Sequence, residues 1–367
     1  MKILIQFGNK GDSVTDHLIT PIAYATNVEK ILMVCRHRGP EIPKVEYYST
    51  PHFVARFAPI AVIYEFLTLL RLAIFGKPDC IGGYLLFPHV TMAFLTAKLT
   101  GKPVIASLIS GPYEFYTQES FEKFDFSNPP PWHGRLFLKL LKHSDVITTT
   151  GKFTKNFLTK HGVKSDRIYP MINPANETKF HPVELPKVHD VVSVATLIRI
   201  KHIEIVLYAI SRVKMKYPNI KACIVGDGSS KRNLMKIAVN LGIKDNVTFV
   251  GFQKDVTYYY NSARIFVHTS EHEGFPNVFL EASMCGLPCV VSDCGDITDI
   301  AQDGYNCIVI PEYKDYEAFA EAIIHLLDDG DLYREMAKNA LKSVQKLSRT
   351  EITETWEKIF NKIRLHS

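Results

Sequence analysis

The sequence predicts an α/β protein built from two parallel sheets, each wound with helices. Short apolar runs of strand length alternate with helical patterns along the whole chain, which is typical of parallel sheets. The alternation is interrupted once, near the middle, by a stretch with several prolines. The 367 residues suffice for two domains with sizeable cores.

The predicted strands fall into two groups. Those of the first half are residues 3–7, 31–35, 80–85, 104–108 and 146–150. Those of the second half are residues 191–195, 221–225, 247–250, 265–268, 288–292 and 306–310. Ligands of open parallel sheets bind beyond the carboxyl ends of the strands, so we expect a site in a cleft between two facing sheets.

The interruption predicts a linker over residues 173–186, with three prolines and little periodicity. It separates two Rossmann-like domains, residues 1–172 and 187–345. The last segment, residues 346–367, is predicted to be a helix. Ser348 and Glu351 form a capping-box pattern there, and its apolar residues share one face that either half could cover. Those apolar residues are Ile352, Trp356, Ile359, Phe360 and Ile363.

The composition is that of an ordinary soluble globular protein, with 22% charged and 46% hydrophobic residues. The net charge of +5 favours an anionic membrane surface or a phosphorylated ligand, but it is too weak to indicate nucleic acid. Residues 1–8 are too short an apolar run for a secretory signal and predict a first strand. We therefore expect a cytoplasmic protein. A peripheral position on the inner face of the membrane is the alternative.

The seven cysteines form no Cys-x-x-Cys pair. Cys285, Cys289 and Cys294 could be drawn as a metal site, but residues 286–288 break the helix between the first two. No matching histidine pair follows. We therefore expect buried thiols in a reducing compartment and no metal.

The stretch 271–282 places two carboxylates around a Gly-Phe-Pro turn. Glu273 follows a predicted strand, Gly274 permits close backbone approach, and Pro276 suits the first turn of a helix over 277–285. Glu281 lies inside that helix. Carboxylates beside free helical N–H groups suit a ligand with phosphate and several hydroxyls. The simpler alternative is an ordinary helix with an acidic first turn.

With Glu281 eight positions after Glu273, this stretch resembles the Glu-x7-Glu signature of glycosyltransferase family 4. Residues 172–180, 225–228, 247–252 and 303–306 resemble further segments of that family, so the likeness covers most of the second half and is looser in the first. The resemblance implies the GT-B fold, which has two facing Rossmann-like domains and a terminal helix that crosses back to the first.

The resemblance also implies roles for individual residues. Glu273 would contact the donor sugar and Lys201 the diphosphate, and these two are the predicted catalytic residues. Glu281 would bind the ribose hydroxyls. The other donor-binding residues that it implies are Gly8, Gly11, Thr196, Arg199, Gly226, Gly251, Phe252, Gly274, Phe275, Asn277 and Val278.

Two positions depart from the family pattern. Thr196 stands where the family has an arginine, five residues before Lys201, and nearby Arg199 is either its substitute or a solvated surface residue. The histidine that many members carry after the strand 104–108 is absent, since the chain continues as residues 109–114. Glu114 is a candidate replacement, and a surface carboxylate is the alternative.

The first half offers features for the acceptor side. The loop 8–12 has glycines but no Gly-x-Gly-x-x-Gly pattern, and His17 follows as a helix-face residue or a catalytic one. Residues 53–75 are strongly apolar and predict either a buried helix or a surface for a lipid-linked acceptor or membrane docking. Residues 134–143 add a basic amphipathic stretch, and residues 128–132 form a predicted loop.

Together these features predict a retaining hexosyltransferase that uses a nucleotide-sugar donor and a glycan or lipid-linked acceptor. Retention, independence from metals and the lack of any cofactor are implied by the resemblance. A nucleotide-sugar epimerase and a non-catalytic sugar-nucleotide-binding subunit remain alternatives. A nicotinamide dehydrogenase is disfavoured because neither half has its fingerprint.

Overall fold

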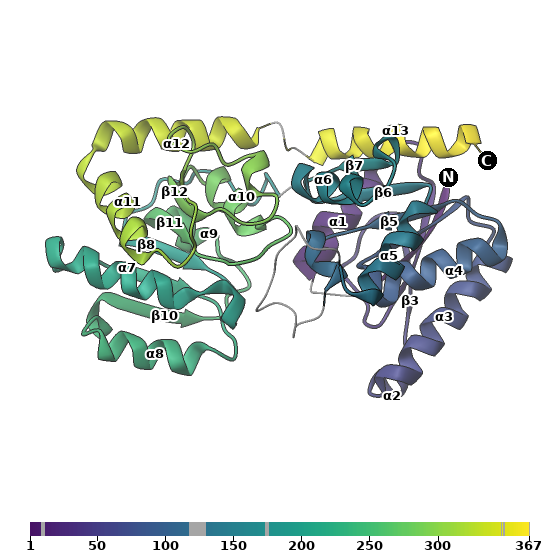
Figure 1. Cartoon of the computed structure of the whole chain (residues 1–367), viewed down its shortest axis with the longest axis horizontal. Coiled ribbons are helices and arrows are strands. Elements are labelled where there is room, and N and C mark those ends of the chain that lie inside the picture. The colour runs from purple at the N-terminus through teal and green to yellow at the C-terminus, as the bar shows by residue number, and fades with distance from the viewer. Residues whose placement is uncertain (9–11, 117–129, 173–175, 346, 348, 367) are drawn as a thin grey trace. The chain divides into compact units, whose positions relative to one another are not determined.

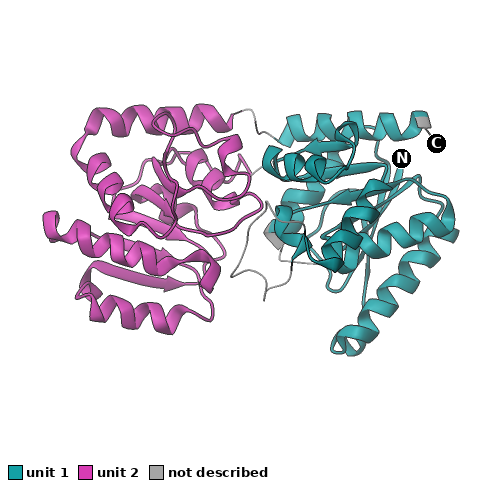
Figure 2. Cartoon of the chain, in the orientation of Figure 1, with its two compact units in different colours: residues 1–174, 349–367 teal, residues 175–348 magenta. Residues whose placement is uncertain are grey.

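The computed structural model describes the chain except for residues 9–11, 117–129, 173–175, 346, 348 and 367. It divides into unit 1, residues 1–174 with 349–367, and unit 2, residues 175–348 (Figure 2). Each unit contains one sheet, and every strand pairing among the described residues is parallel. The predicted α/β class with two parallel sheets is confirmed.

Unit 1 has a sheet with the order β3-β2-β1-β4-β5-β6-β7 among the described residues. Its strands are β1 Lys2–Phe7, β2 Lys30–Cys35, β3 Val45–Ser49, β4 Cys80–Tyr84, β5 Val104–Ser107, β6 Val146–Thr149 and β7 Ile168–Pro170. Its helices are α1 Asp12–Tyr24, α2 His52–Ala55, α3 Ala58–Phe75, α4 Thr91–Thr100, α5 Trp132–Lys142, α6 Lys152–Lys160 and α13 Arg349–His366. Its short helical turns are η1 Leu86–Val90, η2 Gly111–Phe115 and η4 Ser165–Arg167.

Alternate residues of these strands point to opposite faces, and different helices cover each face. Leu4 and Ile81 pack under α3 and α4, and Ile147 on the same face packs under α5 and α6. Ile3 and Ile5 point to the other face, which α1 and α13 cover. The layer of α3, α4 and α5 is thus the outer surface on one side of unit 1 (Figure 1).

Unit 2 has a sheet with the order β10-β9-β8-β11-β12-β13 among the described residues. Its strands are β8 His189–Val194, β9 Ala222–Val225, β10 Val247–Gly251, β11 Ala263–His268, β12 Cys289–Ser292 and β13 Ile308–Ile310. Its helices are α7 Ile203–Lys216, α8 Lys231–Asn240, α9 Thr257–Asn261, α10 Asn277–Met284, α11 Tyr316–Asp328 and α12 Gly330–Val344. Its short turns are η5 Arg199–Lys201, η6 Lys244–Asn246 and η7 Ile297–Asp299.

The main core of unit 2 lies between the sheet and α7, α8 and α11. Ile265 and Val267 of β11 point into it. Phe266 points to the opposite face and packs edge-on against Tyr260 of α9, with ring centroids 5.8 Å apart. All seven cysteines of the chain are buried free thiols, as the sequence predicts.

The structure differs from the sequence-based elements in three places. Two strands, β3 and β7, were not predicted, and both lie at the edges of the unit 1 sheet. The predicted linker is in part a piece of unit 2, because Asn261 accepts a hydrogen bond from the Val183 backbone and donates one to the His181 carbonyl. Residues 173–175 and Ser348 of the predicted capping box lie outside the described residues.

The third difference is α3. A buried helix over residues 53–75 was the simpler prediction, and it is wrong. Only Ala61, Glu65, Leu69, Leu72 and Ala73 of α3 are buried. By length and composition the helix could cross a membrane. Only 28% of it is buried inside the structure.

The terminal helix α13 belongs to unit 1. Trp356 and Phe360 pack among Leu18 and Ile19 of α1, which completes the core on that face of the sheet. Arg349, at the start of α13, forms an ion pair with Asp16 of α1. The terminal helix therefore covers the first unit, as the GT-B expectation required.

Candidate functional site

The candidate site lies in unit 2, where β11 ends and the chain turns into α10. Three hydroxyl groups fix this turn. Thr269 donates to the carbonyls of Lys201 and His202, both at 3.0 Å, and Ser270 donates to the Ile200 carbonyl at 3.2 Å. Ser292, from β12, donates to the Ser270 carbonyl at 2.6 Å. These bonds tie η5 to the end of β11, although some seventy residues separate them in sequence.

This arrangement brings Lys201 against Glu273, where the two side chains form an ion pair. Both are mostly shielded from solvent, with 18% and 16% of the side chains exposed. Shielding strengthens an ion pair relative to one in water but does not seal it off from a ligand. The two predicted catalytic residues are therefore in direct contact.

His268, the last residue of β11, lies behind this pair. Its Nε2 is 3.5 Å from Glu273 Oε1. Burial lowers the pKa of His268 to about 4, with Lys201 lowering it further and Glu273 opposing them. The ring is therefore neutral at pH 7, and Lys201 supplies the positive charge beside Glu273.

A second set of charges supports the turn from the side. The ring of His202 contacts Glu204 at 2.7 Å and Glu271 at 3.1 Å, and it packs against Tyr313 with centroids 4.7 Å apart. Burial alone would lower the pKa of His202, but its hydrogen bonds to Glu204 and Glu271 outweigh burial and raise it. His202 has a left-handed backbone conformation, with φ 45°, where the chain leaves η5 for α7.

Gly295, which sequence analysis did not identify, holds the backbone of the acidic turn. Its φ is +60°, and a Cβ atom there would lie 2.1 Å from the Glu273 carbonyl oxygen and 2.6 Å from that of Gly274. The next residue, Asp296, donates its N–H to the Gly274 carbonyl at 2.8 Å. The loop after β12 can approach this closely because the position has no side chain.

Glu281 lies in α10 and is 8% exposed. Its carboxylate accepts a hydrogen bond from the Tyr260 hydroxyl at 3.0 Å, and Tyr260 is fully buried. Burial raises the pKa of Glu281 to about 7, although the Tyr260 hydrogen bond works in the opposite direction. In contrast to Glu273, this carboxylate has no ion pair among the described residues. Sequence analysis did not identify Tyr260.

The start of α10 presents backbone donors. The residue before it, Pro276, is buried and provides no side-chain cap. Asn277 begins the helix, and its side-chain oxygen is buried with no hydrogen-bond partner among the described residues. The first N–H groups of a helix lack internal acceptors and attract anions. Gly274 and Phe275 are buried in the turn, and Val278 follows in the first helical turn.

The remaining predicted donor residues of unit 2 lie where other strands end. Gly226 follows β9, and a Cβ atom there would lie 1.8 Å from the Ala195 carbonyl oxygen, so two loops touch through their backbones. Gly226 donates its N–H to the carbonyl of Gly251, which has φ +74° at the end of β10. Phe252 follows with 76% of its surface exposed, as a platform for a planar ring would be.

Thr196, on the loop after β8, and Arg199, the first residue of η5, are both exposed. Among the described residues, the ion pair between Glu273 and a lysine or arginine is the one with Lys201. Whether Arg199 takes the place of the family arginine thus stays a prediction.

In unit 1, the loop after β1 requires a glycine. A Cβ atom on Gly8 would lie 2.2 Å from His89 Nε2. The His89 ring is buried, and its Nδ1 is 3.3 Å from the side-chain nitrogen of Gln6. Gly11, the other glycine predicted for this loop, lies outside the described residues.

Glu114 has a role that neither sequence interpretation anticipated. Its carboxylate accepts hydrogen bonds from the backbone N–H groups of Leu86, Ile109 and Ser110, at 2.7, 2.7 and 2.8 Å. It therefore joins the loops after β4 and β5. A carboxylate engaged by three donors within its own unit is not a solvated surface group, and its contact with a sugar stays a prediction.

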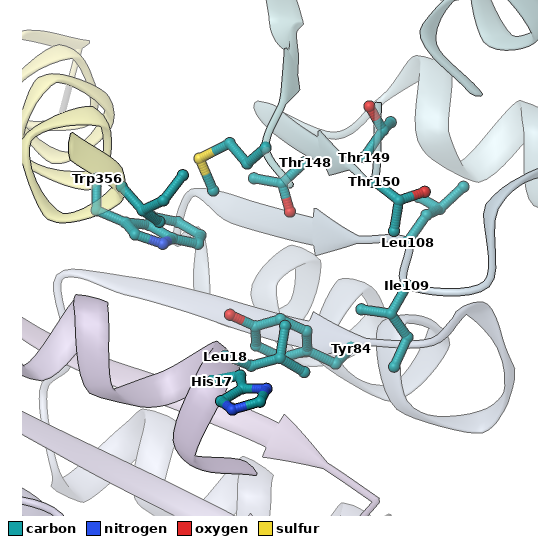
Figure 3. A pocket seen from close by; sticks show the side chains of 11 residues that line it. His17, Leu18, Tyr84, Leu108, Ile109, Thr148, Thr149, Thr150 and Trp356 are labelled. Atoms are coloured by element: carbon teal, nitrogen blue, oxygen red, sulfur yellow. The ribbon is translucent and has the colours of Figure 1, made fainter. Parts of the chain in front are cut away.

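A small cavity lies near the carboxyl ends of β4, β5 and β6 in unit 1 (Figure 3). Its volume is about 20 Å³, which is room for a single water. His17, predicted on a helix face, is buried and lines this cavity together with Tyr84 and Trp356. The cavity is too small for a sugar.

Comparison with known proteins relates most of unit 2 to a glycosyl transferase family. Residues 176–343 match the family described as Glycosyl transferases group 1. One relative is the N-acetyl-alpha-D-glucosaminyl L-malate synthase of Bacillus anthracis, 26% identical over 288 residues, or 74% of this chain and 72% of the relative. Another is an uncharacterized glycosyltransferase of Haemophilus influenzae, 28% identical over 221 residues, or 59% of this chain and 61% of the relative.

Solved structures share the fold. HepE of Anabaena, solved in complex with UDP, covers 99% of this chain and 100% of its own, with a TM-score of 0.77 and 18% identity. Sucrose-phosphate synthase of Thermosynechococcus elongatus covers both chains fully, with a TM-score of 0.78 and 18% identity. These likenesses confirm the predicted GT-B fold.

Proposed function

We propose that this chain, a relative of the group 1 glycosyl transferases, is a retaining hexosyltransferase of family 4. It takes its hexosyl group from a nucleotide sugar and transfers it to a glycan or lipid-linked acceptor. The observation that supports this best is the contact between Lys201 and Glu273 at the end of β11, beside the uncapped start of α10.

The ion pair of Lys201 and Glu273 suits a nucleotide-sugar donor, because each side chain can exchange its contact with the other for a contact with the ligand. The Lys201 ammonium would move to the diphosphate, and Glu273 would then accept hydrogen bonds from sugar hydroxyls. The N–H groups at the start of α10 would bind phosphate oxygens. Charges that are positioned before the reaction lower its barrier because no reorganisation is needed as the leaving group develops negative charge.

The proposed reaction occurs on one face of the sugar. The bond between sugar C1 and the diphosphate oxygen breaks, and the acceptor oxygen bonds to C1 on the same face. The acceptor proton passes to the leaving phosphate oxygen, so the anomeric configuration is retained. Lys201 neutralises the diphosphate, and the ring of His268, whose pKa is about 4, stays neutral and does not take up the acceptor proton.

UDP-sugars are the first donors to test, because the HepE structures were solved with UDP and with UDP-glucose. Phe252 would stack on the base, and Glu281 would bind the ribose. Since Glu281 has a pKa of about 7, it can donate or accept in these bonds near neutral pH.

The test is incubation of purified protein with UDP-, GDP- and ADP-sugars without acceptor, in EDTA or in Mg²⁺. We expect one donor to stabilise the protein thermally and to release nucleotide slowly, equally in both buffers. Glu273→Gln should abolish most of this release. An altered sugar still attached to its nucleotide would identify an epimerase. Absence of binding to any donor would favour a non-catalytic subunit.

A further inference from the structure

The outer surface of α2 and α3 carries many apolar side chains that do not pack against the rest of unit 1. Phe53, Phe57, Ile60, Ile63 and Leu67 are each more than half exposed, with values from 54% to 73%. Single exposed apolar side chains are ordinary, but a continuous set along one helical arm marks an interaction surface.

Neighbouring helices extend this surface. α4 lies beside α3, with α2 at the tip of α3 (Figure 1). Leu99 of α4 is 68% exposed, and on α5 Trp132 and Leu136 are 72% and 58% exposed. Because α3, α4 and α5 cover the same face of the sheet, these side chains belong to one side of unit 1.

The exposed charges on these helices have one sign. Residues 52–75, 91–100 and 132–142 contain a single acid, Glu65, and it is fully buried. The exposed ionic side chains on these segments are all basic, although the whole chain has 38 acids against 43 lysines and arginines. They are Arg56, Arg71, Lys98, Arg135, Lys139 and Lys142.

Glu65 also fixes how α3 can meet a bilayer. Its carboxylate accepts hydrogen bonds from Gln6 at 3.1 Å and Thr50 at 3.3 Å, and it pairs with Arg36 at 3.0 Å. Crossing a membrane would pull this charge away from all three partners into hydrocarbon, which is strongly unfavourable. The helix therefore lies along unit 1 with its outer face available.

We propose that the exposed face of α2, α3, α4 and α5 docks unit 1 onto an anionic bilayer surface. The apolar side chains would enter the interface between headgroups and acyl chains, and the basic ones would contact anionic headgroups. A protein partner or a second copy would bury the same apolar residues, but neither explains why every exposed charge on these helical segments is basic. The proposal does not rest on the transferase function.

The experiment is sedimentation of the full-length protein with vesicles of phosphatidylglycerol or of phosphatidylcholine, without nucleotide sugar. We expect binding to phosphatidylglycerol vesicles that weakens with salt, and little binding to phosphatidylcholine. The apolar variant Phe57→Gln/Ile63→Gln/Leu67→Gln should bind about tenfold more weakly or worse. The basic variant Lys98→Gln/Lys139→Gln/Lys142→Gln should lose about fivefold per charge removed.

A matched control is Met215→Gln/Met235→Gln/Val239→Gln, which changes exposed apolar residues on α7 and α8 of unit 2. It should bind like wild type, and all three variants should melt at the wild-type temperature. Wild-type protein that stays in the supernatant with both vesicles overturns the proposal. So does equal binding by the apolar variant, or a dimer in sedimentation velocity that only the apolar variant loses.

Discussion

Two carboxylates of unit 1, Glu65 and Glu114, contrast in their environment with Glu273 of unit 2. In unit 1, Glu65 and Glu114 are surrounded by donors of their own unit, and Glu114 alone accepts three backbone N–H groups. In unit 2, Glu273 has a flexible lysine as partner and retains some exposure. A carboxylate held by backbone donors fixes loops, whereas one held by an ammonium can exchange that partner for a ligand.

The largest effect should come from removing the exchangeable charge. Glu273→Gln keeps the shape but removes the charge opposite Lys201, so nucleotide release should fall about 10²–10³-fold, as for other preorganised electrostatic groups. Steady-state rates at saturating donor test this. Turnover close to wild type would refute the role of Glu273.

Next in size is the backbone contact under the acidic turn. Gly295→Ala would force a Cβ atom into the carbonyls of Glu273 and Gly274. We expect a loss of about 1–3 kcal/mol in the free energy of unfolding, with weaker donor binding. The matched control is Gly304→Ala, which has φ +70° but nothing within 4 Å, and it should show the backbone strain alone. Equal effects of the two changes would contradict the contact.

Glu114→Gln tests the opposite half of the comparison. An amide nitrogen cannot accept the N–H groups that face it, so unit 1 should lose about 1–3 kcal/mol in urea unfolding. Donor binding by unit 2 should stay unchanged. Glu41→Gln, whose side chain is 94% exposed, should change neither quantity. A loss of donor affinity in Glu114→Gln would show that the sugar does contact this residue.

The smallest effect concerns pH. Glu281 has a pKa of about 7 in the folded chain against 4.5 ordinarily, so its contribution to stability is present below pH 4.5 and is lost as pH rises through 7. His268 has a pKa of about 4 against 6.5, so its contribution is present above pH 6.5 and is lost as pH falls. The two oppose each other between pH 4.5 and 6.5.

Single variants should separate these two contributions. Glu281→Gln should lose stability more steeply than wild type as pH falls from 6.5 to 5, and His268→Gln should lose it as pH rises instead. Slopes of about 1 kcal/mol per pH unit are expected. Hydrogen exchange of β11 and α10 amides, measured at pH 5, 6 and 7, reports on unit 2 directly. Parallel curves for all three proteins would contradict the assigned pKa values.

Sequence periodicity predicted the central strands because buried parallel strands are continuous apolar runs. It missed β3 because an edge strand such as Val45–Ser49 is half-buried and includes polar residues. It left α3 open between a buried helix and a surface for an acceptor or a membrane, since apolar composition does not say which face of a helix finds a partner. The position of α3 on unit 1 depends on Glu65, whose partners are far away in sequence.

The same limit applies to the site. Glu273 could be proposed because it lies in a motif with a local spacing. Lys201 could be proposed because it matches a position of the family that the chain resembles. Thr269, Tyr260 and Gly295 could not, because each acts through a residue brought near only by the fold. Glu114 was assigned to the sugar or the surface because a sequence does not show which backbone N–H groups surround a carboxylate.

The assignment of α13 to unit 1 makes unit 2 an insertion between two parts of unit 1. During synthesis, Trp356 and Phe360 can therefore cover the α1 face of the first sheet only after all of residues 175–348 have emerged. Unit 2 is continuous and can finish folding first, while Leu18 and Ile19 are still uncovered. A ribosome that stops before residue 349 would release a chain with an exposed apolar face, a substrate for chaperones and proteases.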